Sequence, residues 1–129
     1  MKATTKEWIT AAEDDLLSAK KLVDESRLTN IVAFHCQQCL EKSFKGFIEE
    51  KDLSFIKSHD LLRLCDITGI QLPENETIML ETINEVYIDA RYPADLGLMP
   101  QGKPTTREAL KFIAFTESLF NKIKNQIDK

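Results

Sequence analysis

Apolar residues recur at spacings of three and four along almost the whole chain, and the alternating pattern typical of strands is scarce. This spacing matches the 3.6-residue turn of an α-helix, so each segment can present one apolar stripe to a shared core. The chain has 129 residues, which suits a single domain with one core. We therefore expect one all-α domain over residues 1–129, an antiparallel up-and-down bundle of four long helices and one short helix.

Short polar side chains at the start of each periodic stretch predict where the helices begin, because their oxygens accept hydrogen bonds from unpaired backbone N–H groups. The second helix is expected to run to about Glu50, and Gly69 to end the short third helix. Pro73 is expected to open the fourth helix, and Pro93 disfavours helical geometry in the residue before it. The expected caps are, in chain order, Thr4 or Thr5, Thr29 or Asn30, Ser58, and Thr105 or Thr106.

The charge balance limits the classes of partner. Lys and Arg number 17 against 21 Asp and Glu, and the net charge of -4 argues against a broadly basic nucleic-acid-binding surface, although a local basic patch can still exist. No apolar run approaches the roughly 20 residues that span a bilayer, and the N-terminal segment lacks the apolar stretch of a signal peptide. Three cysteines, an odd number, do not make a disulfide framework. These features predict a cytoplasmic protein with reduced thiols and no membrane partner.

The second expected helix carries polar side chains where a plain bundle would carry leucine or alanine. Gln38, Glu41 and Lys45 follow one another at spacings of three and four, so they share one helix face. His35, Gln38 and Lys42 form a neighbouring strip. Spacing alone favours an ordinary solvated face, on which Glu41 and Lys45 form a pair worth a few tenths of a kcal/mol.

Cys36 and Cys39 form a C-x-x-C motif, which also occurs in redox and zinc sites. The motif lies inside an amphipathic helix with no strand before it, and only His35, His59 and Cys65 are available to complete a zinc site. Cysteine is also a common small buried residue. We therefore expect both thiols to pack in the core and expect no metal and no cofactor, with a thiol or metal protein as the weaker alternative.

Three segments carry an ordered pattern of polar residues. They are Gln37-Gln38-x-x-Glu41-Lys42 followed by Lys45, then Ser58-His59-Asp60-Leu61, then Arg91-Tyr92-Pro93. Together with the segment over residues 12–19, this set resembles the HEPN family over nearly the whole chain. The resemblance implies a helical bundle like the helical part of kanamycin nucleotidyltransferase, and a homodimer whose paired helices surround a polar cleft.

The same resemblance implies which side chains face the cleft. Arg91 suits such a place because its planar guanidinium can bind a carboxylate or phosphate through two hydrogen bonds. The other interpretation of Arg91 is a cation at a helix C-terminus, bound to backbone carbonyls. We expect a polar cluster that unites Asp15, Glu41, Lys45 and Arg91. The full set of cleft-facing residues that the resemblance implies is Asp15, Gln38, Glu41, Lys45, His59 and Arg91.

Many HEPN proteins are metal-independent ribonucleases, whose signature is an arginine followed after four to six residues by a histidine. This chain departs from that signature, since no histidine follows Arg91 and seven residues separate Arg27 from His35. The chemistry needs a histidine to move a proton and an arginine to stabilise the developing phosphorane. We therefore expect a binding module without catalytic residues. The alternative is a divergent ribonuclease that acts as a dimer and uses Arg91 or Arg27 with His35 or His59.

The resemblance also implies partners other than a second copy of the chain. One is a separate minimal nucleotidyltransferase, in a two-component system of toxin–antitoxin or nucleotide-handling type. The other is a nucleotide or RNA in the polar cleft. Neither follows from composition or spacing.

Overall fold

The computed structural model describes residues 1–54, 57–91 and 103–129, with side chains up to residue 87 in the second range. Every regular element within these ranges is helical, which confirms the expected all-α class. The elements are α1 (Ala3–Leu22), the 3-10 turn η1 (Ser26–Leu28), α2 (Thr29–Glu50), α3 (Leu61–Thr68), α4 (Glu74–Arg91) and α6 (Thr106–Ile127).

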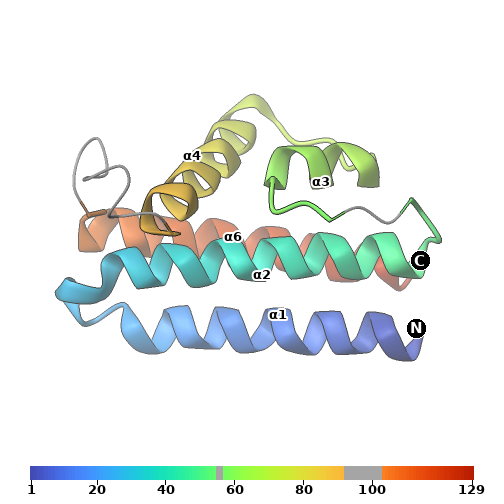
Figure 1. Cartoon of the computed structure of the whole chain (residues 1–129), viewed down its shortest axis with the longest axis horizontal. Coiled ribbons are helices and arrows are strands. Elements are labelled where there is room, and N and C mark those ends of the chain that lie inside the picture. The colour runs from blue at the N-terminus through green and yellow to red at the C-terminus, as the bar shows by residue number, and fades with distance from the viewer. Residues whose placement is uncertain (55–56, 92–102) are drawn as a thin grey trace.

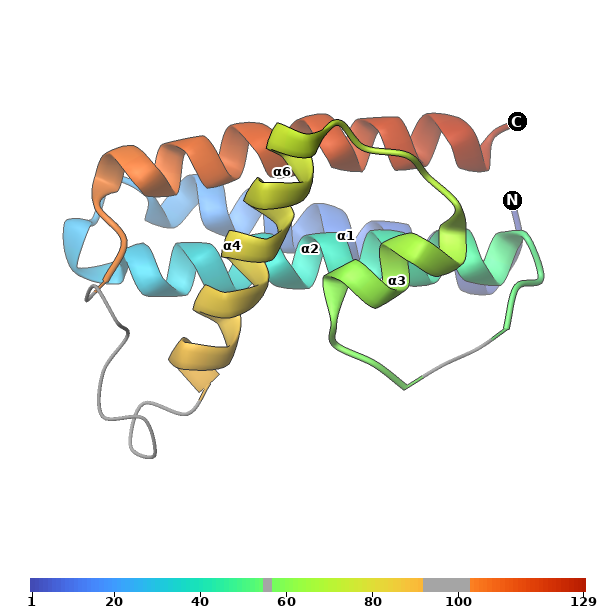
Figure 2. The same cartoon turned by 90° about the horizontal axis from the view of Figure 1, so that it is seen from above.

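Successive long helices reverse direction, which gives the expected up-and-down bundle (Figure 1). α1 and α2 lie side by side along the long axis, and α6 runs along them in the same direction as α2. α4 crosses the bundle obliquely on the side that also carries the short α3 (Figure 2). α2 contacts all four of the other helices, so it is the central element of the fold.

The core forms where the apolar stripes of these helices meet around α2. Leu40 and Phe44 of α2 are completely buried, as are Cys36 and Cys39 on the same helix. Burial of each such aliphatic or aromatic side chain contributes roughly 1.5–3 kcal/mol. The packing of these side chains around α2 is therefore the main source of stability. Other large side chains at the centre of the core are Leu61, Leu64, Leu80, Ile83, Leu119 and Ile123.

Gly46 sets how closely α1 and α2 approach. A Cβ atom at this position would lie 3.1 Å from Cδ1 of Ile9 and 3.2 Å from Cβ of Trp8. Both distances are shorter than ordinary van der Waals contact, so only glycine fits without a shift of α1. The close approach brings α1 side chains within reach of polar groups on α2.

The expected caps of the first two helices are wrong. α1 begins one residue before Thr4, its N-cap is Lys2, and no side chain caps it. Thr4 instead donates a hydrogen bond of 2.7 Å to the Glu49 carboxylate of α2. α2 begins at Thr29 without a side-chain cap, because the chain enters it directly from η1. None of the four expected capping residues therefore caps its helix. These residues are Thr4, Thr5, Thr29 and Asn30.

The remaining helix ends follow local sequence more closely. Asp60, not Ser58, caps α3 by accepting a hydrogen bond from the backbone N–H of Leu62. Gly69 ends α3 in a left-handed conformation with φ of 73°, as expected. Thr105 caps α6 in a reciprocal capping box with Glu108.

α4 begins directly after Pro73 and ends at Arg91. Residues 94–104 hold two glycines and two prolines, from which a loop is expected, and most of them lie outside the described residues. No helix in the described ranges is both long and apolar enough to cross a membrane.

Candidate functional site

One side of α2 carries a group of polar side chains that contact α1 on one flank and the segment before α3 on the other. We call this surface the α2 polar face. Two buried carboxylates, Asp15 of α1 and Glu41 of α2, anchor its two halves. Its members from α2 are His35, Gln37, Gln38, Glu41, Lys42 and Lys45.

Asp15 anchors the half that faces α1. Its Oδ1 lies 2.9 Å from Nδ1 of His35, and its Oδ2 accepts a 2.7 Å hydrogen bond from Nζ of Lys42. His35 and Lys42 are seven residues apart, two helical turns, so α2 presents both to the same carboxylate. Burial of a carboxylate is costly, and the paired cation with its hydrogen bonds offsets that cost.

Glu41 anchors the other half, and its side chain is only 6% exposed. Its Oε1 accepts a hydrogen bond of 3.1 Å from Gln37 and lies 3.0 Å from Nδ1 of His59. Its Oε2 accepts a hydrogen bond of 2.9 Å from Nζ of Lys45. Three donors from two segments of the chain therefore converge on one buried carboxylate.

These donors determine the ionisation of Glu41. Burial, the largest single effect, raises the pKa of its carboxyl, but the hydrogen bonds from Lys45, Gln37 and His59 together lower that pKa below its ordinary value. Glu41 is therefore ionised at neutral pH, when a carboxylate can only accept hydrogen bonds. Nδ1 of His59 must then carry the proton, which leaves Nε2 as the acceptor of the neutral ring.

Gln37 and Gln38 extend the network along α2. Gln37 is fully buried, and its amide nitrogen donates both to Glu41 and, over 3.0 Å, to the backbone oxygen of His59. Gln38 donates to Oε1 of Gln37 over 2.7 Å. Because Gln38 precedes Glu41 by three residues and Lys42 by four, it lies between the two carboxylate centres.

His59 is positioned by α4 as well as by α2. Asn84 of α4 accepts a 3.1 Å hydrogen bond from the backbone N–H of Leu61, and its amide donates to Asp60 over 3.3 Å. The residues that follow His59 are thus hydrogen-bonded to α4. The ring and the backbone carbonyl of His59 are hydrogen-bonded to α2. The ring remains 54% exposed, so a ligand can reach it.

Aromatic rings connect the two histidines. Phe34 stacks on Tyr87 of α4 with ring centres 5.6 Å apart, and it forms a T-shaped pair with His35 with ring centres 5.5 Å apart. Tyr87 also lies 6.3 Å from the His59 ring. At the far end of the face, Nζ of Lys45 lies 5.7 Å from the centre of the Trp8 ring, within the range of a cation–π contact.

The structure brings together four of the six expected cleft residues. Glu41, Lys45, Gln38 and His59 belong to one hydrogen-bonded network, and the solvated-face interpretation of Glu41 and Lys45 is wrong because both are largely buried. Asp15 joins the other centre, with His35 and Lys42.

Arg91 is the sixth expected residue, and its side chain lies outside the described residues. The expected contact of Arg91 with the cluster of Asp15, Glu41 and Lys45 therefore stays a prediction. Within the described part of the chain, Asp15 and Glu41 share no direct hydrogen-bond donor.

Sequence reasoning missed several members of the site. His35 and Lys42 were recognised as a neighbouring strip, but nothing in the local pattern identified Asp15 as their partner. Gln37 stands in the Gln-Gln pair, yet its buried role at Glu41 has no sequence signal. The contact of Asn84 with the start of α3 is tertiary, so no local pattern predicts it.

The cysteines pack in the core and belong to no polar centre. Cys36, Cys39 and Cys65 are all buried free thiols. Burial raises the pKa of Cys36 to about 12 and raises the pKa of Cys39 and Cys65 as well. Among the described residues, no group of three or more His, Cys, Asp or Glu side chains is arranged to hold a metal ion.

Comparison with known proteins agrees with the fold and identifies the family. The crystal structure of ST0689, an archaeal HEPN homologue, has 26% sequence identity and a TM-score of 0.75, over 98% of this chain and 99% of that chain. TT1696 from Thermus thermophilus shares the fold at a TM-score of 0.78 with 20% identity, over 94% of this chain and 96% of its own. No curated protein matches the sequence. The family model described as HEPN domain matches residues 5–126, and the chain therefore belongs to the HEPN domain family.

Proposed function

We propose that the chain is a cytoplasmic HEPN binding module whose α2 polar face binds a nucleotide or RNA. The observation that carries this proposal is the His59 ring, which Glu41 holds at Nδ1 over 3.0 Å while 54% of its side chain stays exposed. An imidazole fixed in this way offers one oriented nitrogen to a ligand. Lys45 pairs with the buried carboxylate, so its positive charge offsets the negative charge that would otherwise repel a phosphate.

The surroundings of His59 support a ligand with both a phosphate and an aromatic base. Lys42 and Lys45 lie on the same face with 27% and 14% of their side chains exposed, each bound to a carboxylate, and the amide of Gln38 lies one helical turn before Lys42. The half-exposed ring of His59 is the aromatic group open to a base, and the buried ring of Tyr87 supports it from behind with ring centres 6.3 Å apart. Cations contact phosphate and flat rings stack on bases, so the two kinds of group together suit a nucleotide.

Binding is tested by NMR titration of the native protein with ATP and with a short single-stranded RNA. We expect shifts centred on the α2 polar face, and a His59→Ala variant that loses them. Lys111→Ala on the exposed side of α6 is the matched control and should bind like the parent. Undiminished binding by His59→Ala, with shifts elsewhere on the protein, would contradict the proposal.

The HEPN family membership supports two further partners. We propose that the chain forms a homodimer and that it associates with a separate minimal nucleotidyltransferase, in a toxin–antitoxin or nucleotide-handling system. Co-expression with the product of the neighbouring gene tests the second partner. A nucleotidyltransferase that co-purifies at a fixed stoichiometry supports the association, and one that elutes separately contradicts it.

One observation favours ribonuclease activity as a second candidate function. A histidine whose Nδ1–H is held by a carboxylate has its Nε2 free to accept a proton, which is the arrangement that a general base needs. The test is incubation of the protein with RNA in the presence of a chelator. Cleavage that disappears in both His59→Ala and Arg91→Ala would favour the enzyme, and no cleavage by the parent would favour the binding module.

A further inference from the structure

We propose that the α2 polar face takes up one proton from solvent when it binds a phosphate, and that Nε2 of His59 holds this proton and donates it to a phosphate oxygen. This inference rests on the function proposed above. It assigns the atom that contacts the phosphate, and it makes binding depend on pH. The contact uses the edge of the imidazole and leaves the face of the ring for a base.

The two nitrogens of the His59 ring have different surroundings. Nδ1 lies 3.0 Å from Oε1 of Glu41, whose side chain is only 6% exposed, whereas 54% of the His59 side chain is exposed. An ionised carboxylate only accepts hydrogen bonds, so Nδ1 carries a proton whenever this contact is present. Nε2 is therefore the nitrogen that differs between the neutral ring and the charged ring.

A neutral His59 ring cannot offer an N–H group to a ligand and keep its contact with Glu41. If Nε2 carried the only proton, Nδ1 would be an acceptor that faces another acceptor. If the ring turned over, a carbon atom would take the place of Nδ1 beside the carboxylate. Fully buried Gln37 donates a 3.0 Å hydrogen bond to the backbone oxygen of His59, which holds the residue against α2. The neutral ring therefore presents Nε2 to a ligand as an acceptor.

A phosphate at this position needs the charged ring. Phosphate oxygens are acceptors, so they repel the lone pair of a neutral Nε2 and bind an N–H group instead. A proton from solvent gives the imidazolium two N–H groups, one directed at Glu41 and one at the phosphate. No other bond changes. Where the free ring is neutral, the complex holds one proton more than the free protein, and binding is linked to protonation.

The charges around the ring are already paired with each other. Glu41 and Lys45 of α2 are joined over 2.9 Å, and Asp60 accepts a hydrogen bond from the amide of Asn84 over 3.3 Å. α4 brings the buried ring of Tyr87 to 6.3 Å from the His59 ring. The added proton therefore supplies a positive charge at the point where the phosphate approaches. The titratable groups that face the ring or flank it in the chain are, among the described residues, Glu41, Lys45, Lys57, Asp60 and Tyr87.

His35 is the second of the two histidines in the chain and provides an internal comparison. Its Nδ1 lies 2.9 Å from Oδ1 of Asp15, a contact like that of His59 with Glu41. Only 24% of the His35 side chain is exposed. General effects of added charge act on both rings, whereas direct contact with a ligand is expected at the more exposed ring of His59.

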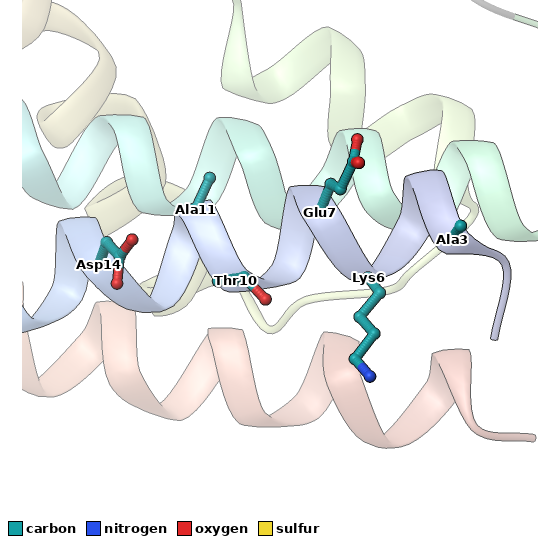
Figure 3. A pocket seen from close by; sticks show the side chains of 6 residues that line it. All are labelled: Ala3, Lys6, Glu7, Thr10, Ala11 and Asp14. Atoms are coloured by element: carbon teal, nitrogen blue, oxygen red, sulfur yellow. The ribbon is translucent and has the colours of Figure 1, made fainter.

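A shallow depression of about 530 Å³ along the exposed side of α1 provides a contrast (Figure 3). Its charged members are Lys6, Glu7 and Asp14, and the side chains of Lys6 and Glu7 point to opposite sides. Lysines and carboxylates keep their charges between pH 7 and pH 8. An RNA held there by Lys6 would therefore bind equally well at both pH values. The full lining is Ala3, Lys6, Glu7, Thr10, Ala11 and Asp14.

The pH dependence of the affinity tests the linkage. The probe is a short single-stranded RNA with hydroxyl ends, because a terminal phosphate would itself titrate near pH 6. At constant ionic strength, its dissociation constant should rise about five- to tenfold from pH 7 to pH 8, close to the limit for uptake of one proton. His59→Gln cannot titrate and should show no such rise. Lys111→Ala on the exposed side of α6 is the control and should keep the pH dependence of the parent.

The NMR signals of the two imidazoles give a second readout that needs no variant. By reciprocity, an RNA that binds the charged ring must raise the pH at which the His59 ring loses its proton. With RNA about tenfold above the dissociation constant of the protonated form, this midpoint should rise by about one pH unit. The midpoint of His35 should move much less.

The outcomes separate this inference from the function on which it rests. Equal affinity at pH 7 and pH 8, with a His59 midpoint that RNA does not raise, overturns the inference and leaves RNA binding standing. A pH dependence that His59→Gln retains, or equal shifts of both histidine midpoints, overturns the assignment to His59. RNA that binds at neither pH contradicts the proposed function as well.

Discussion

Nδ1 of His59 lies 3.0 Å from Oε1 of Glu41, and this contact joins the segment before α3 to the central helix of the bundle. The carboxylate is buried and the imidazole is half exposed, so the pair connects the protein interior to its surface. Stability and binding are therefore linked at this point. A change at Glu41 alters the fold and the orientation of His59 together, whereas a change at His59 mainly alters what the surface offers to a ligand.

Glu41→Gln should destabilise the protein by about 2 kcal/mol. The amide has nearly the size of the carboxylate, but it weakens the contacts with Lys45, Gln37 and His59 and leaves a partly buried lysine without its counter-charge. Urea unfolding measures the change. Glu85→Gln on the exposed side of α4 is the control and should remain within about 0.5 kcal/mol of the parent. Equal effects of the two substitutions would show that the Glu41 contacts contribute nothing.

The contribution of Glu41 should depend on pH in a defined direction. Its folded-state pKa is lowered, so its ionised form stabilises the fold at pH values above the unfolded-state pKa of about 4.3. That stabilisation is lost as the pH falls through the folded-state pKa, where the carboxyl becomes protonated. The difference in unfolding free energy between the parent and Glu41→Gln should therefore be largest near pH 7 and shrink in acid. A difference that stays constant from neutral pH into acid would contradict the assigned ionisation.

The sequence predicted those parts of the fold that depend on neighbouring residues. The apolar spacing predicted the helices, Gly69 predicted the end of α3, and the pair Thr105 or Thr106 predicted a threonine cap for α6, which is Thr105. The cap of α2 was missed because the chain enters that helix directly from η1, whereas the cap of α1 was missed for a tertiary reason. Thr4 uses its hydroxyl to reach Glu49 on α2, a contact that no local pattern reveals.

The difference between local and tertiary contacts also explains what could be predicted of the site. Glu41 and Lys45 are four residues apart on one helix, so their pairing followed from spacing, although their burial did not. The partners of Asp15 depend on how α1 and α2 are aligned, and close packing at Gly46 contributes to that alignment. Helical periodicity fixes which residues share a face, but it does not fix which face of a second helix they meet.

The three thiols should be unreactive in the native protein. Cys36, Cys39 and Cys65 are buried, and burial raises the pKa of each, so at pH 8 almost no reactive thiolate forms. Ellman's reagent should label them slowly in buffer and completely in denaturant. Replacing Cys36 and Cys39 together by alanine should keep the fold at a cost of about 1–2 kcal/mol. Rapid labelling of the native protein, or zinc that co-purifies with the parent and is lost in the double variant, would contradict the packing role.

Gly46→Ala should destabilise the bundle by about 1 kcal/mol, although alanine is the better helix former. Inside a helix the substitution by itself would gain about 1 kcal/mol. The new methyl group, however, would lie 3.1 Å from Cδ1 of Ile9 and 3.2 Å from Cβ of Trp8. The end of the isoleucine side chain can rotate away, but Cβ of Trp8 is fixed to the α1 backbone. Relief therefore requires α1 to move, and overpacking of this kind costs typically about 1–3 kcal/mol, so the net effect is unfavourable. Thermal unfolding measures it, with Ser118→Ala on the exposed side of α6 as the helix-propensity control. A rise in the midpoint for Gly46→Ala equal to that of the control would mean that α1 and α2 are not held as closely as these distances indicate.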